Sequence, residues 1–200
     1  MQNDLSLKKQ LQKGFTLVEL LIVVIILAIL AAIVVPQFAS TTDDAKISSL
    51  DSTLSNMRGA ISLYRQQHGA FPGSAVSSGG GAACTGASGA VGTGGQNSET
   101  AFLDQLAYYS NAAGATCTTR GTNNAFPYGP YIQKREIPKN PVTNNSALAA
   151  ISTAGVLGLI STADPVGLGW KYDDVSGQFI ADDATKDPTD TTGVKKYYQR

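Results

Sequence analysis

The stretch FTLVELLIVVIILAILAAIVV, residues 15–35, decides the fold of this chain, because its only charged side chain is Glu19. As a helix it would extend about 31 Å, at about 1.5 Å per residue, which matches the hydrocarbon core of a bilayer. An ionised carboxylate near the start of such a helix is costly and indicates a function. The stretch therefore predicts a membrane-length helix that carries one functional acid.

The fourteen residues before this stretch form a basic leader. They contain Lys8, Lys9 and Lys13 against a single Asp4. Basic flanks tend to stay on the cytoplasmic side of a membrane. We therefore expect a single pass with the N-terminus in the cytoplasm.

Three simpler explanations compete for the apolar stretch: a plain signal anchor, a cleavable secretory signal and a buried core helix. A secretory signal places small residues in an Ala-x-Ala arrangement after the apolar run, and Ala28, Ala31 and Ala32 are not spaced in that way. A plain anchor gives no role to Glu19. The acid therefore favours a special role for this helix.

The sequence Gly14-Phe15-Thr16-Leu17-Val18-Glu19, between a basic leader and a long apolar helix, closely resembles the class III signal of type IV pilins and type II secretion pseudopilins. The resemblance implies that a prepilin peptidase cleaves between Gly14 and Phe15, removes residues 1–14 and methylates the new amine of Phe15. It also implies an inner-membrane location, an assembly platform, possible minor pilins as partners, and polymerisation into a periplasmic or cell-surface filament.

Cleavage after Gly14 would place a positive amine on Phe15, four residues from the carboxylate of Glu19. Two buried opposite charges attract strongly, but each is costly to desolvate unless it is paired. In the family, this acid is thought to neutralise the terminal amine of the neighbouring subunit. A pair formed within one chain is the alternative.

An amphipathic helical pattern follows Pro36 over residues 37–68. Its apolar positions recur every three or four residues, which predicts one buried face; they are Ile47, Leu50, Leu54, Met57, Ile61 and Tyr64. Pro36 is expected to kink the helix between the assembly half, residues 15–36, and this second half. Gly69, with Phe71-Pro72 after it, predicts the end of the helix at His68.

Residues 69–181 are expected to form one head domain. Nine glycines in residues 73–97 predict a long surface loop without regular structure. Ser98 should cap a short helix that carries Phe102, Leu106 and Tyr109 on one face. No Gly-Lys-Ser/Thr ending follows the glycines, which argues against a phosphate-binding loop.

Three short strands are predicted near the end of the head: Val156–Ile160, Leu168–Tyr172 and Gln178–Ala181. The last two flank Asp173-Asp174-Val175-Ser176-Gly177, a hairpin loop with glycine where a positive φ is needed. The expected fold class is α+β, with a small antiparallel sheet packed on the apolar stripe of the long helix. Residues 182–200 are expected to be an exposed tail.

Cys84 and Cys117 are the only cysteines. Both lie in the part expected outside the cytoplasm, where an even pair predicts a disulfide between the glycine-rich segment and the region after the short helix. Two unrelated thiols are the alternative. Two cysteines and one distant histidine make a poor metal ligand set.

The inventory of reactive groups argues against an enzyme. The single histidine, His68, is expected at a helix end, where a cation would complement the helix dipole. Acidic residues near the C-terminus are weak calcium candidates; they are Asp173, Asp174, Asp182 and Asp183. The major pseudopilin of type II secretion carries such a site, but its Ser-x-Gly-Ala-Asp-Gly type of ending is missing here.

The sequence therefore predicts a structural subunit of a type IV pilus-like filament, with no cofactor and with itself as main partner. The alternative is a pseudopilin of protein secretion or DNA uptake, and a distant alternative is a membrane-anchored enzyme or binding module. The formal net charge of zero gives no indication of a nucleic-acid partner.

Overall fold

The computed structural model describes residues 15–152 and 169–182, with the backbone alone at residues 36–40 and 149–152. The chain divides into two compact units, residues 1–43 and 44–200, which meet within the first helix. The predicted strand Val156–Ile160 and residues 183–200 lie outside the described residues. The elements are α1 (Leu17–His68), α2 (Gly81–Thr85), α3 (Glu99–Ala107), β1 (Tyr109–Ser110), β2 (Thr116–Cys117), the 3-10 helix η1 (Thr122–Asn124), β3 (Leu148–Ser152), β4 (Trp170–Asp173) and β5 (Phe179–Ala181).

Helix α1 is 52 residues long and continues through Pro36 without interruption. It ends where the sequence predicts, because Gly69 adopts φ = +74°. The amide of Gly69 donates to the carbonyl of Arg65 at 2.8 Å, a bond that closes the last helical turn. The kink at Pro36 stays a prediction.

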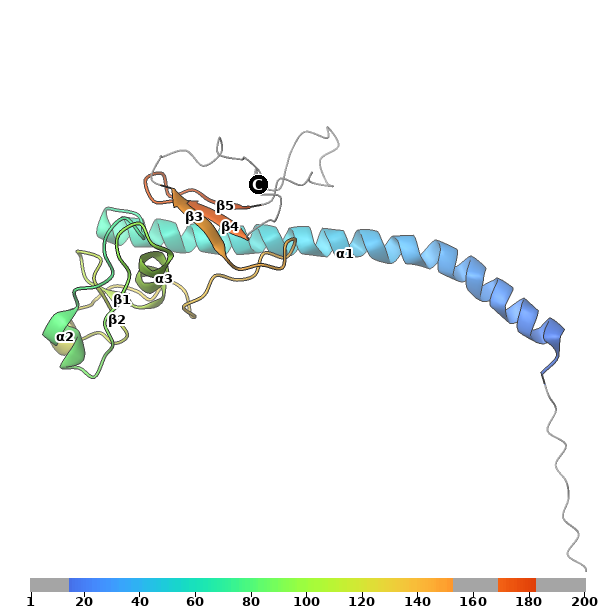
Figure 1. Ribbon diagram of the computed structural model, residues 1–200, viewed down its shortest axis with the longest axis horizontal. Coiled ribbons are helices and arrows are strands. Elements are labelled where there is room, and N and C mark those ends of the chain that lie inside the picture. Colours follow the sequence, from blue (N-terminus) through green and yellow to red (C-terminus); the bar gives the residue numbers. More distant parts are fainter. Residues whose placement is uncertain (1–14, 153–168, 183–200) are drawn as a thin grey trace, which may run out of the picture. The chain divides into compact units, whose positions relative to one another are not determined.

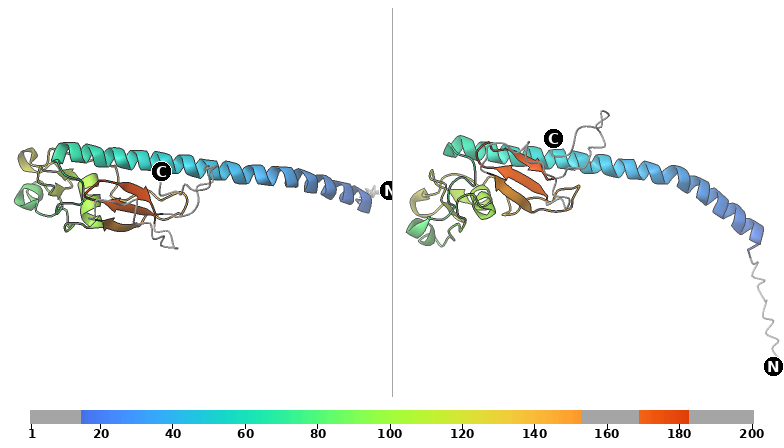
Figure 2. Two further views of the ribbon diagram at one scale, coloured as in Figure 1. Left: turned by 90° about the horizontal axis from the view of Figure 1, so that it is seen from above. Right: turned by 45° about the horizontal axis from the view of Figure 1, so that its top comes forward.

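The second unit is built on the apolar stripe of α1, as the spacing predicts. The stripe packs against Trp170, Tyr172 and Phe179 of the sheet and against Phe102 and Leu106 of α3, all of them fully buried. Figures 1 and 2 show the strands and α3 along the C-terminal part of α1. The indole Nε1 of Trp170 also donates to the carbonyl of Pro138 at 2.8 Å, so its one polar group is satisfied in the core.

The sheet has the order β3-β4-β5. Strands β4 and β5 form the predicted antiparallel hairpin, with Trp170 opposite Ala181 and with Gly177 at φ = +73° in the turn. Strand β3, however, pairs with β4 in parallel, so the sheet is mixed rather than wholly antiparallel. A parallel pair needs a crossover of a dozen or more residues, and residues 153–169 are long enough to provide it.

The glycine-rich segment is more ordered than its composition predicts. It contains the five-residue helix α2, and Val91 forms an isolated bridge with Cys117. A buried carboxylate, Asp104 of α3, organises this segment. Its oxygens accept from the hydroxyl of Ser77 at 2.7 Å and from the amide of Thr93 at 2.9 Å. The prediction of a loop without regular structure was therefore wrong, because hydrogen bonds to distant residues and the contacts of Cys84 and Val91 in an apolar cluster hold this segment.

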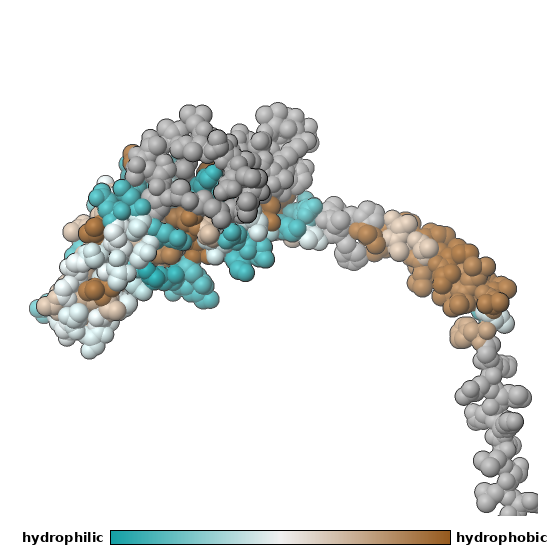
Figure 3. All heavy atoms as spheres, in the orientation of Figure 1, coloured by the Kyte–Doolittle hydropathy of each residue, from teal (hydrophilic) through white to brown (hydrophobic). Residues whose placement is uncertain are grey.

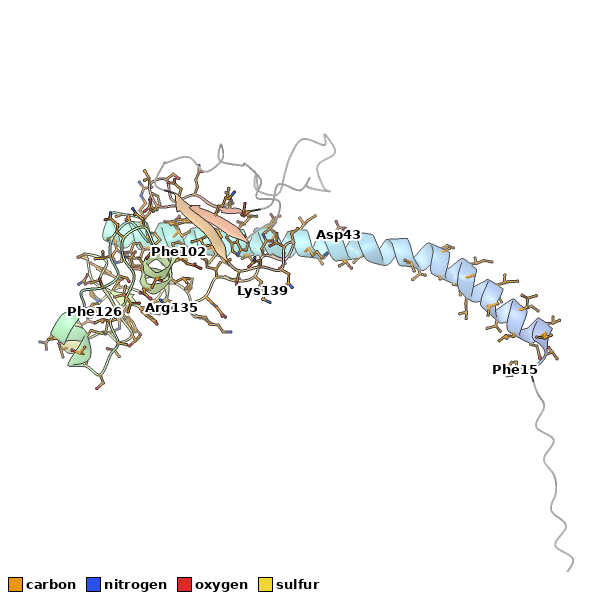
Figure 4. The ribbon with its side chains drawn as sticks, in the orientation of Figure 1. Phe15, Asp43, Phe102, Phe126, Arg135 and Lys139 are labelled. Atoms are coloured by element: carbon orange, nitrogen blue, oxygen red, sulfur yellow. A yellow bond between two sulfur atoms is a disulfide. The ribbon has the colours of Figure 1, made fainter. Side chains whose placement is uncertain are left out.

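Asp104 also receives a charged partner from another loop. The guanidinium of Arg135 donates Nε to Oδ1 of Asp104, which is only 1% exposed. In Figure 4, Arg135 lies beside the region of α3 that carries Phe102. Helix α3 begins as predicted, since Ser98 Oγ accepts from the amide of Ala101 at 3.1 Å. Tyr109, however, lies in β1 and not on the helix, which ends at Ala107.

The predicted disulfide between Cys84 and Cys117 is present. It joins α2 to β2 inside a second apolar cluster that contains Phe126 and Ala115. Both cysteines are fully buried. The bond therefore tethers the glycine-rich segment to the strand after α3, the local role expected from the sequence.

His68 does not act as the cation at the helix end that the sequence predicts. Its ring stacks on Tyr64 with centroids 3.9 Å apart, and Nδ1 lies 3.0 Å from the carbonyl of Tyr64. A carbonyl can only accept, so Nδ1 carries the proton and Nε2 accepts from the hydroxyl of Ser110 at 3.0 Å. Burial lowers the pKa of His68, so the imidazole is neutral at pH 7.

This burial predicts a pH dependence of stability. A lowered pKa in the folded state means that the contribution of neutral His68 is complete above the unfolded pKa of about 6.5. It is lost as the pH falls from there through the folded pKa. Unfolding by urea, followed by the fluorescence of Trp170, should show wild-type stability falling between pH 7 and pH 5 relative to His68→Gln. Parallel pH profiles for the two proteins would contradict this assignment.

Candidate functional site

The N-terminal half of α1 presents a continuous apolar surface. Every leucine, isoleucine and valine from Leu17 to Val35 is at least 40% exposed. Figure 3 shows this segment as the most hydrophobic part of the described surface. Leu17–Val35 is long and apolar enough to cross a membrane. Apolar patches of this size mark surfaces that are covered by lipid or by another protein.

The start of α1 is closed by a capping box formed by Thr16 and Glu19. The amide and the hydroxyl of Thr16 both donate to Glu19 Oε2, at 2.9 and 2.8 Å. In return, the amide of Glu19 donates to Thr16 Oγ1 at 3.2 Å. Thr16 is thus the N-cap and Glu19 the third helical residue, the reciprocal arrangement that satisfies two otherwise unpaired amides.

This cap is a role of Glu19 that the sequence interpretation missed. The Thr-x-x-Glu spacing before an apolar run is its recognisable signal. Both hydrogen bonds from Thr16 use the same carboxylate oxygen, Oε2. Within the described residues no hydrogen bond holds Oε1, so this oxygen can accept from a donor outside the chain. The cap and an intermolecular charge pair are therefore compatible.

The other predicted processing and assembly residues stay untested by the geometry. Gly14 lies outside the described residues, whereas Phe15 is 85% exposed. Phe15 is labelled in Figure 4 at the start of the apolar helix. For Pro36 only the backbone is described. Cleavage after Gly14, methylation of Phe15 and the kink at Pro36 thus stay predictions.

Two of the calcium candidates, Asp173 and Asp182, make side-chain contacts within the chain. Asp173 Oδ1 accepts from the amides of Val175 and Ser176, at 3.0 and 2.6 Å, and so caps the hairpin turn. Asp182 is buried and pairs with Lys171 at 2.7 Å, so the expected exposed tail does not begin there. Burial, followed by the charge of Asp173, raises the pKa of Asp174. Asp183 lies outside the described residues, and calcium binding stays a prediction.

The Ser110–His68 contact has the pairing of a nucleophile and a base, but it lies in the protein interior. Ser110 is fully buried, and the His68 ring is packed between Tyr64 and Tyr128. A substrate carbonyl cannot approach a hydroxyl without solvent access. This pair therefore stabilises the end of α1 against β1 rather than forming an active site.

Comparison with known proteins points to the same N-terminal segment. Residues 9–35 match the prokaryotic N-terminal methylation motif. The chain is 39% identical over 66 residues to type II secretion system core protein G of Pseudomonas aeruginosa, a match that covers 33% of this chain and 46% of that protein. It is 41% identical over 69 residues to a fimbrial protein of Neisseria meningitidis, covering 34% and 41% of the two chains.

A third relative is the major component of the narrow type IV pilus of Thermus thermophilus, with 43% identity over 60 residues, covering 30% of this chain and 52% of the relative. The chain thus matches about half the length of these relatives. No solved structure matches the chain. The relatives include both pilus and secretion proteins, and they support the family expected from the sequence.

Proposed function

Since the chain belongs to the family of type IV pilins and type II secretion pseudopilins, we propose that it is a structural subunit of a type IV pilus-like filament. The observation that supports this most strongly is the uncovered apolar half of α1, from Leu17 to Val35. In a precursor, lipid would cover this surface. In a filament, the same surface would pack among copies of itself.

The single acid in this surface, Glu19, would fix the axial position of one subunit relative to its neighbour. After removal of residues 1–14, the amine of Phe15 and the carboxylate of Glu19 would be the two charges in an apolar environment. Glu19 keeps Oε2 on its own Thr16, and Oε1 is directed to no donor within the described residues. An amine from a neighbouring subunit would pair with Oε1 and relieve the desolvation of both charges.

The proposed precursor lies in the bacterial inner membrane with its N-terminus in the cytoplasm. A prepilin peptidase would cleave after Gly14 and methylate Phe15, and an assembly platform, with or without minor pilins, would extract the subunit from the membrane. The relatives named above are structural proteins, which supports a role as a substrate of this processing rather than as an enzyme.

Mass spectrometry of the mature protein tests the processing. We predict a chain that begins at N-methylated Phe15 and contains the Cys84–Cys117 disulfide. A Gly14→Ala precursor, with a changed residue at the cleavage site, should be processed less well and is the matched control. Mature protein that retains Met1 would contradict the proposal.

Electron microscopy of sheared surface material distinguishes a pilin from a secretion pseudopilin. A strain that expresses a tagged copy should yield long tagged fibres if the chain is a pilin. A pseudopilin of a secretion apparatus is the second candidate, supported by the similarity to core protein G. Tagged protein that is processed but forms no long surface fibres would favour this second candidate.

A further inference from the structure

A cavity lies between the second half of α1 and the β4–β5 hairpin. Arg58, Ser62 and Arg65 line it from the helix, and Ser176 and Gln178 line it from the hairpin. The cavity has a volume of about 420 Å³, within the range typical of small-molecule sites. The three helical residues are spaced by four and by three positions, so they lie on one face of α1. All five side chains can donate hydrogen bonds to a ligand in this space.

The two arginines of this cavity are held in place by the head. The Nε of Arg58 donates to the carbonyl of Phe179 in β5 at 3.1 Å. The guanidinium of Arg65 lies over the ring of Phe71, 4.3 Å from its centroid. That ring lies so close to Gly177 that a side chain at position 177 would overlap with it. Because these contacts restrict both guanidinium groups, the arginines lose less side-chain freedom when they bind an anion.

The charge of the cavity is positive. Among the described residues, its lining includes two arginines and no acid. Asp51 attracts Arg58 from two helical turns away, but it does not line the cavity. Asp173 and Asp174 of the hairpin are buried and also lie outside the lining, and Oδ1 of Asp173 is held by amides of the turn. The cavity therefore suits an anion with more than one negative charge.

A phosphate monoester fits these properties better than other common anions do. At pH 7 such a group carries a charge of about −1.5 to −2 and three strong acceptor oxygens. Two guanidinium groups match that charge, and the planar array of donors on each matches the geometry of phosphate oxygens. A carboxylate or a phosphodiester carries a single charge and would leave one of the two cations without compensation.

We propose that this cavity binds a phosphate group, with Arg58 and Arg65 as its anion-binding residues and with Ser62, Ser176 and Gln178 as further hydrogen-bond donors. A cavity in this size range holds more than a phosphate alone, so the remaining space accommodates the group to which the phosphate is attached, such as a sugar. Free phosphate and a phosphorylated sugar share this chemistry. The site lies wholly within the unit of residues 44–200, so it requires neither processing nor filament assembly.

Isothermal titration calorimetry of the full chain in detergent tests this site, with glucose 6-phosphate as the probe. We expect saturable binding of one molecule per chain. Inorganic phosphate, which lacks the sugar, should bind more weakly, and glucose, which lacks the charge, should not bind measurably. Equal affinities for the two phosphates would support the site and identify free phosphate as its ligand. Absence of saturable binding by either phosphate would overturn the proposal.

Substitutions locate the binding. Arg58→Gln and Arg65→Gln should each weaken the affinity for glucose 6-phosphate by about tenfold or more, because each removes hydrogen bonds between charged groups. Arg120→Gln is the matched control and should leave the affinity unchanged. Arg120 also lies over an aromatic ring, that of Tyr109 at 4.9 Å, but it does not line the cavity. Asp51→Asn should strengthen binding a few-fold, because it removes the acid that attracts Arg58.

Urea unfolding followed by the fluorescence of Trp170 shows whether each variant is folded. A folded Arg65→Gln variant with wild-type affinity, or an equal loss of affinity in Arg120→Gln, would overturn the assignment to this cavity. Asp51 is exposed, so Asp51→Asn tests the site even if an arginine variant does not fold. Unchanged or weaker binding by Asp51→Asn would contradict the proposal.

Discussion

Glu19→Val is expected to leave a processed, membrane-held monomer that forms no filaments. The variant removes the one carboxylate in the apolar segment, so the amine of Phe15 from a neighbouring subunit would be buried without a partner. An unpaired charge in a low-dielectric environment is strongly destabilising. Filament yield in sheared fractions and the mass of the membrane-bound protein measure the two halves of this prediction.

Two further variants separate the charge of Glu19 from its capping role. Glu19→Gln can keep the capping box, because glutamine also serves at that position, but it lacks the charge. Thr16→Ala keeps the charge and removes the cap, at about 1 kcal/mol of helix stability. We expect filaments from Thr16→Ala and none from Glu19→Gln. Normal filaments from Glu19→Gln would show that the cap, and not the charge, is the requirement.

Asp104→Ala is expected to cost about 3–5 kcal/mol of unfolding free energy, the usual consequence of breaking a buried charged network. The change leaves the guanidinium of Arg135, the hydroxyl of Ser77 and the amide of Thr93 without their common acceptor. These groups connect α3 to the glycine-rich segment and to the loop before β3. Loss of the carboxylate should therefore lower the stability of the whole head.

Urea unfolding of the full chain in detergent, followed by fluorescence, measures this effect, because Trp170 is the only tryptophan and is fully buried. Glu136→Ala is the matched control. Glu136 pairs with Lys134 at 3.5 Å, but both side chains are more than two-thirds exposed, so its loss should change stability by less than about 1 kcal/mol. Equal losses of unfolding free energy in the two variants would contradict the role assigned to Asp104.

Features set by nearby residues could be predicted from the sequence. The apolar stripe of α1, the Ser98 cap and the Gly177 turn each depend on residues within a few positions, and all three have the expected form. The disulfide could also be predicted, because the sequence contains only two cysteines.

Features set by distant residues could not be predicted. Asp104 binds Ser77, 27 residues earlier, and Arg135, 31 residues later, and no local pattern indicates either partner. The parallel pairing of β3 with β4 is likewise a choice between long-range partners. The neutral state of His68 depends on Ser110 and Tyr128, which the fold brings to the end of α1.

At the N-terminus, the sequence carried two signals, and the sequence analysis interpreted only one of them. The Thr16-x-x-Glu19 spacing indicated a capping box as clearly as Glu19 indicated a charge pair. The structure shows the first of these, with Oε2 bound to Thr16. The charge pair between Glu19 and a neighbouring subunit stays a proposal.

The central claim is that the apolar half of α1 leaves lipid and packs among copies of itself. A cryo-electron microscopy reconstruction of sheared filaments tests it most directly. We predict that residues 17–35 form the filament core, with Glu19 of one subunit beside the amine of Phe15 in the next. A processed protein that stays in the membrane as a monomer, or filaments in which these residues lie outside the core, would contradict the claim.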